Sequence, residues 1–120
     1  MATISESLQE VMKIEGAMAA AIVDGTTGMC LGTASREEMD MEVAAAGDTE
    51  VFRSKLRALE QQGRAAVIEE ITITLPKELH IIKTLARDRN LFLYLLLDRH
   101  GCNQALAMRK LANVERDLDV

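Results

Sequence analysis

Aromatic side chains are nearly absent from this sequence of 120 residues. It contains two Phe, one Tyr and no Trp, so aromatics make up 2% of a chain that is 48% hydrophobic. The core must therefore be built from aliphatic side chains. Acidic residues outnumber basic ones by 19 to 14, and the formal net charge is −5. A chain without a positive surface or base-stacking rings is poorly suited to nucleic acids, and we expect no nucleic-acid partner.

Cysteines and long apolar runs are also scarce. Cys30 and Cys102 are too few for a disulfide framework and form no Cys-x-x-Cys pair. Two free thiols fit a reducing cytoplasm, and the N-terminal residues lack the pattern of a secretion signal. The longest apolar run, residues 91–97, falls far short of the ~20 residues of a membrane-spanning helix. We expect a cytoplasmic protein without membrane insertion.

The sequence also lacks the residue patterns of common active sites. His100 and Cys102 are its one local His–Cys pair, and no zinc-ligand spacing surrounds them. Residues 24–28 are rich in Gly and Thr but lack the Lys and the spacing of a phosphate-binding loop, which favours a hairpin turn. No Gly-x-Ser-x-Gly nucleophile motif is present. We therefore expect no catalytic residue, no metal and no cofactor.

Hydrophobic periodicity predicts a single domain over residues 1–120, in the order helix, two strands, helix, three strands, helix. The expected helices cover about residues 4–14, a segment that starts between 36 and 41 and ends at 61–63, and a segment that follows Asn103. The expected strands cover about residues 17–23, 29–33, 65–75, 79–86 and 91–97. Short connections between strands imply antiparallel pairing. The prediction is an α+β fold with a five-stranded, mostly antiparallel sheet and three helices.

The second helix carries two apolar stripes. One, expected to cover the sheet, consists of Met41, Ala45, Phe52, Leu56 and Leu59. The other is narrower and consists of Val43, Gly47, Val51, Ser54 and Ala58. Its small side chains would let a second helix approach closely. The alternative is that these residues pack inside the monomer, because small residues are often buried.

From Glu70 to Leu75 of the predicted third strand, polar and apolar side chains alternate, as in a strand with one solvated face. If this strand lies at the sheet edge, pairing with a second copy would satisfy its backbone groups. Glu69 and Glu70 favour the opposite reading, because charged side chains protect an edge that stays open. On the second helix, Glu50, Arg53 and Arg57 form a charged face that fits either a docking surface or a plain solvated surface.

Four segments together resemble the roadblock/dynein light chain family, and the resemblance spans residues 7–118. They are the strand-turn-strand Ala-Ala-Ile-Val-Asp-Gly-Thr-Thr-Gly-Met at 20–29, the Ala-rich second helix, the strand at 91–98, and Asn-Gln-Ala-Leu-Ala-Met-Arg-Lys-Leu at 103–111. The resemblance implies a domain without enzymatic activity that dimerises through the second helix and third strand. It also implies that the paired helices form a platform for Ras-like small GTPases, as in bacterial regulators of gliding motility.

From this resemblance we expect a non-enzymatic homodimeric regulator or scaffold that binds a Ras-like small GTPase. The expected dimer interface consists of Val43, Gly47, Val51, Ser54, Ala58, Ile71 and Ile73. The expected partner-binding residues are Glu50, Arg53 and Arg57. Two alternatives stay open: a small-ligand sensor with a cavity between helix and sheet, and an adaptor in a cytoskeletal or motor complex.

Overall fold

Five antiparallel strands form one sheet in the spatial order β2-β1-β5-β4-β3. The computed structural model describes residues 1–120. Its strands are β1 (Ala17–Asp24), β2 (Cys30–Ser35), β3 (Glu70–Thr74), β4 (Glu78–Thr84) and β5 (Leu91–Asp98). Its helices are α1 (Ile4–Val11), α2 (Met41–Gln61) and α3 (Gln104–Asp117). The predicted α+β fold and element order are confirmed.

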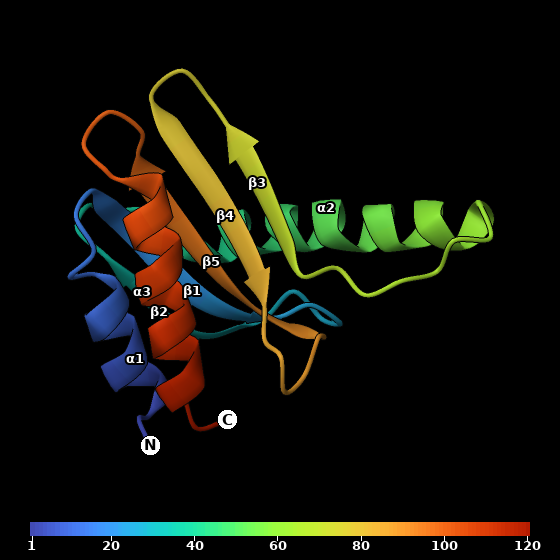
Figure 1. The fold of residues 1–120 in the computed structure, drawn as a ribbon, viewed down its shortest axis with the longest axis horizontal. Helices are drawn as coiled ribbons and strands as arrows, with labels where there is room; N and C mark the ends of the chain where they lie inside the picture. The colour runs from blue at the N-terminus through green and yellow to red at the C-terminus, as the bar shows by residue number, and fades with distance from the viewer.

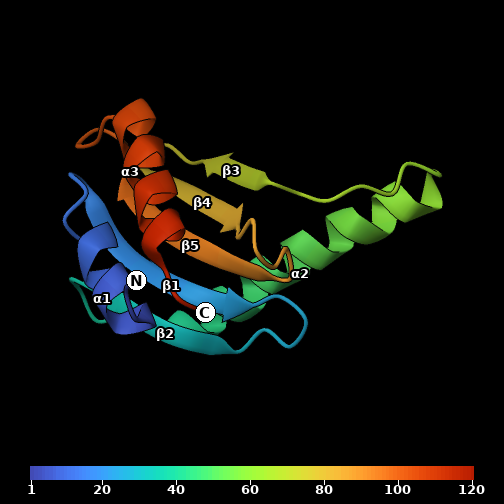
Figure 2. The same ribbon diagram turned by 60° about the horizontal axis from the view of Figure 1, so that its bottom comes forward.

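The helices lie on opposite faces of the sheet. Helices α1 and α3 contact each other on one face, whereas α2 crosses the other face (Figures 1 and 2). The central strand β5 contributes side chains to the core on both faces of the sheet, because its successive side chains point to opposite faces. Leu93, Leu95 and Leu97 pack toward α1 and α3. Phe92, Tyr94 and Leu96 belong to the core on the α2 side, which confirms the prediction of a central strand covered on two sides.

Local signals in the sequence fix several element ends. Thr3 and Glu6 form the expected capping box, with hydrogen bonds of 3.0 and 3.1 Å. The Asn103 side chain accepts a 3.1 Å hydrogen bond from the Leu106 amide and caps α3. The turn at residues 24–28 joins β1 to β2, so the predicted hairpin is confirmed. Gly63 follows α2 with a φ of 67°, a conformation that favours glycine.

Three predicted elements are longer than the observed ones. The first helix ends at Val11 rather than near residue 14, because Met12 already caps it. Strand β4 ends at Thr84, where the chain turns toward β5. Strand β3 begins only at Glu70, not at residue 65. Residues 62–69 instead return from the far end of α2, which lies beyond the sheet (Figure 1). No helix has the length and apolar character needed to span a membrane.

Candidate interaction surface

The fully buried side chains of helix α2 all lie in its N-terminal part. Asp40 begins the helix by accepting a 3.1 Å hydrogen bond from the Val43 amide. The buried side chains that follow are Met41, Ala45, Thr49 and Phe52. Phe52 is the last of them, and its ring centre lies 5.7 Å from that of Phe92. Beyond Phe52 no side chain of the helix is fully buried, although Leu56 still packs against the core. The C-terminal part of the helix runs on past the sheet as a projecting arm (Figure 1).

The stripe of small residues on α2 is open to solvent. Val43 is 67% exposed and Val51 is 40% exposed. No atom lies within 4 Å of the position that a Cβ would take at Gly47. Ser54 is exposed and Ala58 is half-buried. The alternative in which this stripe packs inside the monomer is therefore wrong.

Strand β3 lies at the edge of the sheet and pairs only with β4. Ile71 is half-buried and packs against the core on the α2 side. Ile73, also half-buried, pairs in register with His80. Both isoleucines therefore lie on the face of the sheet that α2 crosses. The outer backbone edge of β3 has no partner strand within the chain.

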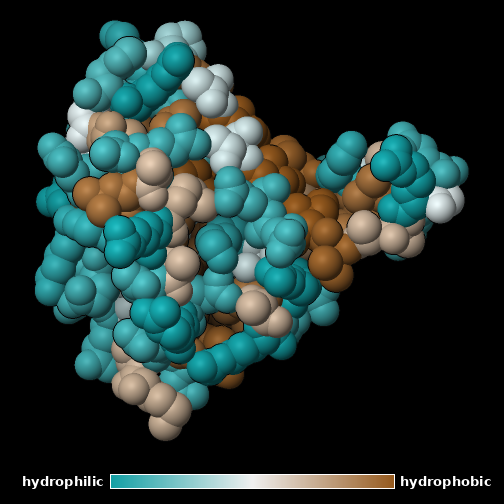
Figure 3. Space-filling model, viewed as in Figure 1, coloured by the Kyte–Doolittle hydropathy of each residue, from teal (hydrophilic) through white to brown (hydrophobic).

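A groove of ≈ 610 Å³ separates the projecting half of α2 from the segment that leads into β3. Its lining residues are Val51, Lys55, Leu59, Val67, Ile68, Glu69, Glu70 and Ile71. Figure 3 shows hydrophobic side chains gathered where the projecting helix leaves the body. Val51 belongs both to the stripe and to the groove, and Ile71 belongs both to the groove and to β3. Stripe, groove and strand edge thus form one surface.

The sequence analysis missed part of this groove. It assigned Leu59 to the stripe that covers the sheet, but the helix outruns the sheet and Leu59 lines the groove instead. Lys55 and Val67 were not singled out. The spacing of Val51, Lys55 and Leu59 at every fourth residue was the available signal, because such residues share one helix face.

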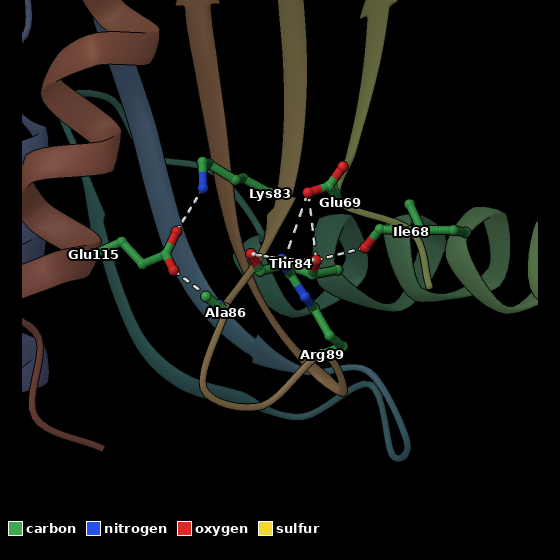
Figure 4. A network of polar contacts seen from close by, with 7 residues as sticks. All are labelled: Ile68, Glu69, Lys83, Thr84, Ala86, Arg89 and Glu115. Atoms are coloured by element: carbon green, nitrogen blue, oxygen red, sulfur yellow. Dashed lines mark hydrogen bonds and ion pairs between the residues drawn. The ribbon is translucent and has the colours of Figure 1, made fainter. Parts of the chain in front are cut away.

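Polar contacts link the returning segment, residues 62–69, to β4 and link β4 in turn to α3 (Figure 4). The Thr84 hydroxyl donates to the Ile68 carbonyl, and the Thr84 amide donates to the Glu69 carbonyl at 3.1 Å. Arg89 donates hydrogen bonds of 3.3 and 3.2 Å to the carbonyl and hydroxyl of Thr84. Its guanidinium also lies 3.9 Å from the Glu69 carboxylate. These bonds hold one wall of the groove in place.

Glu115 of α3 completes this network. Its carboxylate accepts hydrogen bonds from the Lys83 ammonium and, at 2.8 Å, from the Ala86 amide. Burial alone would raise the pKa of Glu115, but the bonds from Lys83 and Ala86 outweigh it and lower that pKa below the usual range. The ionised carboxylate is therefore the form that links α3 to β4.

The residues predicted to bind a partner share one exposed face of α2. Glu50, Arg53 and Arg57 are spaced three and four residues apart and are all exposed. The Arg53 guanidinium donates a 3.3 Å hydrogen bond to the Thr26 carbonyl in the β1–β2 turn. The structure thus brings the three side chains together, with Arg53 partly oriented by that turn.

A second polar cluster lies between α2 and the sheet. Asp48 projects from α2, and burial raises its pKa to about 6, against a smaller opposing effect of His80. His80 of β4 lies 3.2 Å from the Glu78 carboxylate and 3.1 Å from the Tyr94 hydroxyl. Burial and then the charges of Asp48 and Glu78 raise the pKa of Tyr94. No group of three or more His, Cys, Asp or Glu side chains is placed to hold a metal ion.

No protein-family model and no curated protein matches this sequence. Among solved structures, the Roadblock/LC7 domain from Streptomyces avermitilis superposes with a TM-score of 0.81 at 12% identity, covering 96% of this chain and 93% of that one. MglB of Myxococcus xanthus gives 0.80 at 12% identity, with 94% and 89% covered.

An MglB with a tetrameric arrangement gives a TM-score of 0.70 at 15% identity, covering 95% of this chain and 88% of that one. The chain therefore has the roadblock/LC7 fold, in a form similar to MglB. The predicted resemblance is confirmed at the level of the fold.

Proposed function

We propose that this chain is a non-enzymatic homodimeric regulator or scaffold that associates through α2 and β3. We further propose that its paired helices bind a Ras-like small GTPase. The observation that carries the proposal is the single uncovered surface formed by the α2 stripe, the groove and the free edge of β3. An apolar helix face and an unpaired strand edge are each features that proteins normally cover.

The helix side of this surface suits a second helix. Gly47 stands between Val43 and Val51 and has open space around it. A glycine at the centre of a contact allows two helix backbones to approach, and the flanking valines then supply apolar area. An MglB with the same fold forms a tetrameric arrangement, which supports association for this chain too.

The strand side suits self-pairing. In an antiparallel pair of β3 strands centred on Thr72, each Ile71 would stand opposite the partner's Ile73. Each Glu70 would stand opposite the partner's Thr74, so the glutamates would not face each other. Cross-strand pairs of β-branched side chains stabilise a sheet, whereas like charges directly opposite destabilise it. The charged edge residues are thus compatible with self-association.

The charge of the projecting arm supports a docking role. Residues 53–64 contain four basic side chains and one acidic one, although the whole chain carries a formal charge of −5. A local excess of positive charge steers association with a negatively charged partner surface. We assign Glu50, Arg53 and Arg57 to the contact with the GTPase because they are exposed on this helix.

Replacing Gly47 tests the dimer. Gly47→Gln adds a side chain that the monomer accommodates freely, so the fold should persist while the two helices are forced apart. We expect sedimentation equilibrium to show a dimer for the wild type and a monomer for Gly47→Gln. Gly47→Ala is the matched control, because it removes the glycine but adds only a methyl group, and it should stay dimeric. A dimeric Gly47→Gln protein would contradict the proposed interface.

The GTPase contact is tested separately by using the tagged chain to capture partners from the organism's own lysate. The lysate is supplemented either with GDP or with a non-hydrolysable GTP analogue. We expect recovery of a small GTPase in one nucleotide state and at least a tenfold smaller yield with Arg53→Glu/Arg57→Glu. Arg109→Glu, on the exposed face of α3, is the control and should capture normally. Equal yields from all three proteins would refute the assignment of these arginines.

The groove also favours one competing function, the small-ligand sensor. Its volume of ≈ 610 Å³ lies in the range of ligand pockets, and apolar side chains make up most of its lining. A sensor would gain thermal stability with a metabolite by mass action. That gain would persist in the Gly47→Gln monomer, whereas a dimer contact through the same groove would be lost.

A further inference from the structure

Asp48 is a carboxylate that the fold places in a predominantly apolar layer. It lies on the sheet-facing side of α2, three residues after Ala45 and four before Phe52, which are both buried. Its Oδ2 atom is buried and has no hydrogen-bond partner. A buried carboxylate oxygen without a donor is costly while the group is ionised, and far less so when it is protonated.

The side chains that face Asp48 from the sheet cannot supply the missing donor. The two ring nitrogens of His80 are already engaged, one with Glu78 and the other with the Tyr94 hydroxyl. Most other side chains of this layer are apolar, among them Ala19, Ala21 and Val23 of β1, Ile71 of β3, and Ala45 and Phe52 of α2. Its two buried hydroxyls donate elsewhere, Thr49 to the Ala45 carbonyl and Thr84 to the Ile68 carbonyl. The titratable groups around Asp48 are therefore His80 and Glu78 from β4 and Tyr94 from β5.

We propose that Asp48 is a proton-operated latch between α2 and the sheet. The neutral carboxyl lets the first half of the helix pack, and the ionised carboxylate weakens that packing. The latch is a property of the single chain. Its use to regulate partner binding rests on the proposed function, because α2 carries the stripe and the charged face assigned to partners.

The direction of the pH effect follows from the two states. Burial raises the pKa of Asp48 from its ordinary value of 3.8 to about 6 in the folded chain. Between these values the folded state binds more protons than the unfolded state, so stability falls as pH rises. The stabilisation by the proton is complete below pH 3.8 and is lost as pH rises through about 6.

The test compares wild type with Asp48→Asn, which keeps the shape of the side chain and removes its charge. Urea unfolding is followed by circular dichroism at pH 7 and pH 5, at a concentration where sedimentation shows one species. Between these pH values, we expect the unfolding constant of the wild type to fall by about tenfold relative to that of Asp48→Asn. Glu60→Gln, an exposed carboxylate on the same helix, is the control and should track the wild type.

A direct measurement covers the case in which Asp48→Asn perturbs the fold. The ¹³C NMR signal of the Asp48 carboxyl in the wild-type chain should titrate with a midpoint near 6. A midpoint at or below 4, or a ratio of wild-type to Asp48→Asn unfolding constants that does not change between pH 7 and 5, would overturn the proposal. Neither result depends on whether Gly47→Gln dissociates the dimer. The proposed role of Asp48 and the proposed dimer can therefore be refuted independently.

Discussion

Phe52 is the last fully buried residue of α2, and its removal should release the projecting arm. The side chain is 3% exposed, and its ring packs against Phe92 and against the backbone at Gly25. Truncating a buried phenylalanine to alanine costs about 3–5 kcal/mol through lost transfer energy and the cavity left behind. A domain of this size has a stability of about 5–15 kcal/mol. We therefore expect Phe52→Ala to stay folded with a much lower urea midpoint.

Hydrogen exchange distinguishes release of the arm from general weakening. In Phe52→Ala, amides of residues 53–61 should exchange faster by a larger factor than amides of β5, because no α2 residue beyond Phe52 is buried. Leu106→Ala is the control: Leu106 is 41% exposed, and its loss should cost less than about 1 kcal/mol. A cost below 1 kcal/mol for Phe52→Ala, or equal acceleration in residues 53–61 and in β5, would refute the idea that Phe52 anchors the arm.

Two further effects follow from the structure. Glu115→Gln should lower stability by about 1–3 kcal/mol at neutral pH, because it leaves the half-buried Lys83 without its charged partner. The pKa of Glu115 is lowered in the folded state, so its contribution is present above the unfolded value of 4.5 and is lost as pH falls through the folded value. Urea unfolding at pH 7 and pH 4 should therefore show the difference between wild type and Glu115→Gln shrinking on acidification. In the Gly47 pair, replacing a mid-helix glycine should also stabilise the subunit fold by about 0.5–1 kcal/mol, measured as the urea midpoint of monomeric Gly47→Gln against wild type diluted to monomer.

The fold followed from the sequence because its signals are local. Residues 91–97 are all apolar, and successive side chains of a strand point to opposite faces of the sheet. Only a central strand covered on both faces can bury such a run. The capping residues Thr3 and Asn103 mark where helices begin, since they satisfy backbone amides a few residues away. Such interactions need no knowledge of the rest of the chain.

The groove and the latch depend on contacts between elements that lie far apart in the sequence. Val67 lines a groove with Val51 only because residues 62–69 return from the end of a helix that is longer than the sheet is wide. Periodicity assigned Leu59 to the covering stripe because it records which face a side chain occupies, not whether the sheet still lies beneath it. The start of β3 was misplaced for the same reason, since the residues before Ile68 follow the arm and the chain first bonds to β4 at Ile68 and Glu69.

Asp48 is the case in which the sequence held a usable signal. It lies in register with Ala45 and Phe52 on the face of α2 that covers the sheet, where a carboxylate breaks the apolar pattern. A helix that only needed to pack would place an apolar residue there. The other face of α2 exposes Val43 and Val51, which a helix that only needed solubility would replace by polar residues. Both departures occur on one helix, and Asp48 and Val51 lie within one turn of each other. A change in the charge of Asp48 would thus alter the packing of the same turn that presents Val51 to a partner.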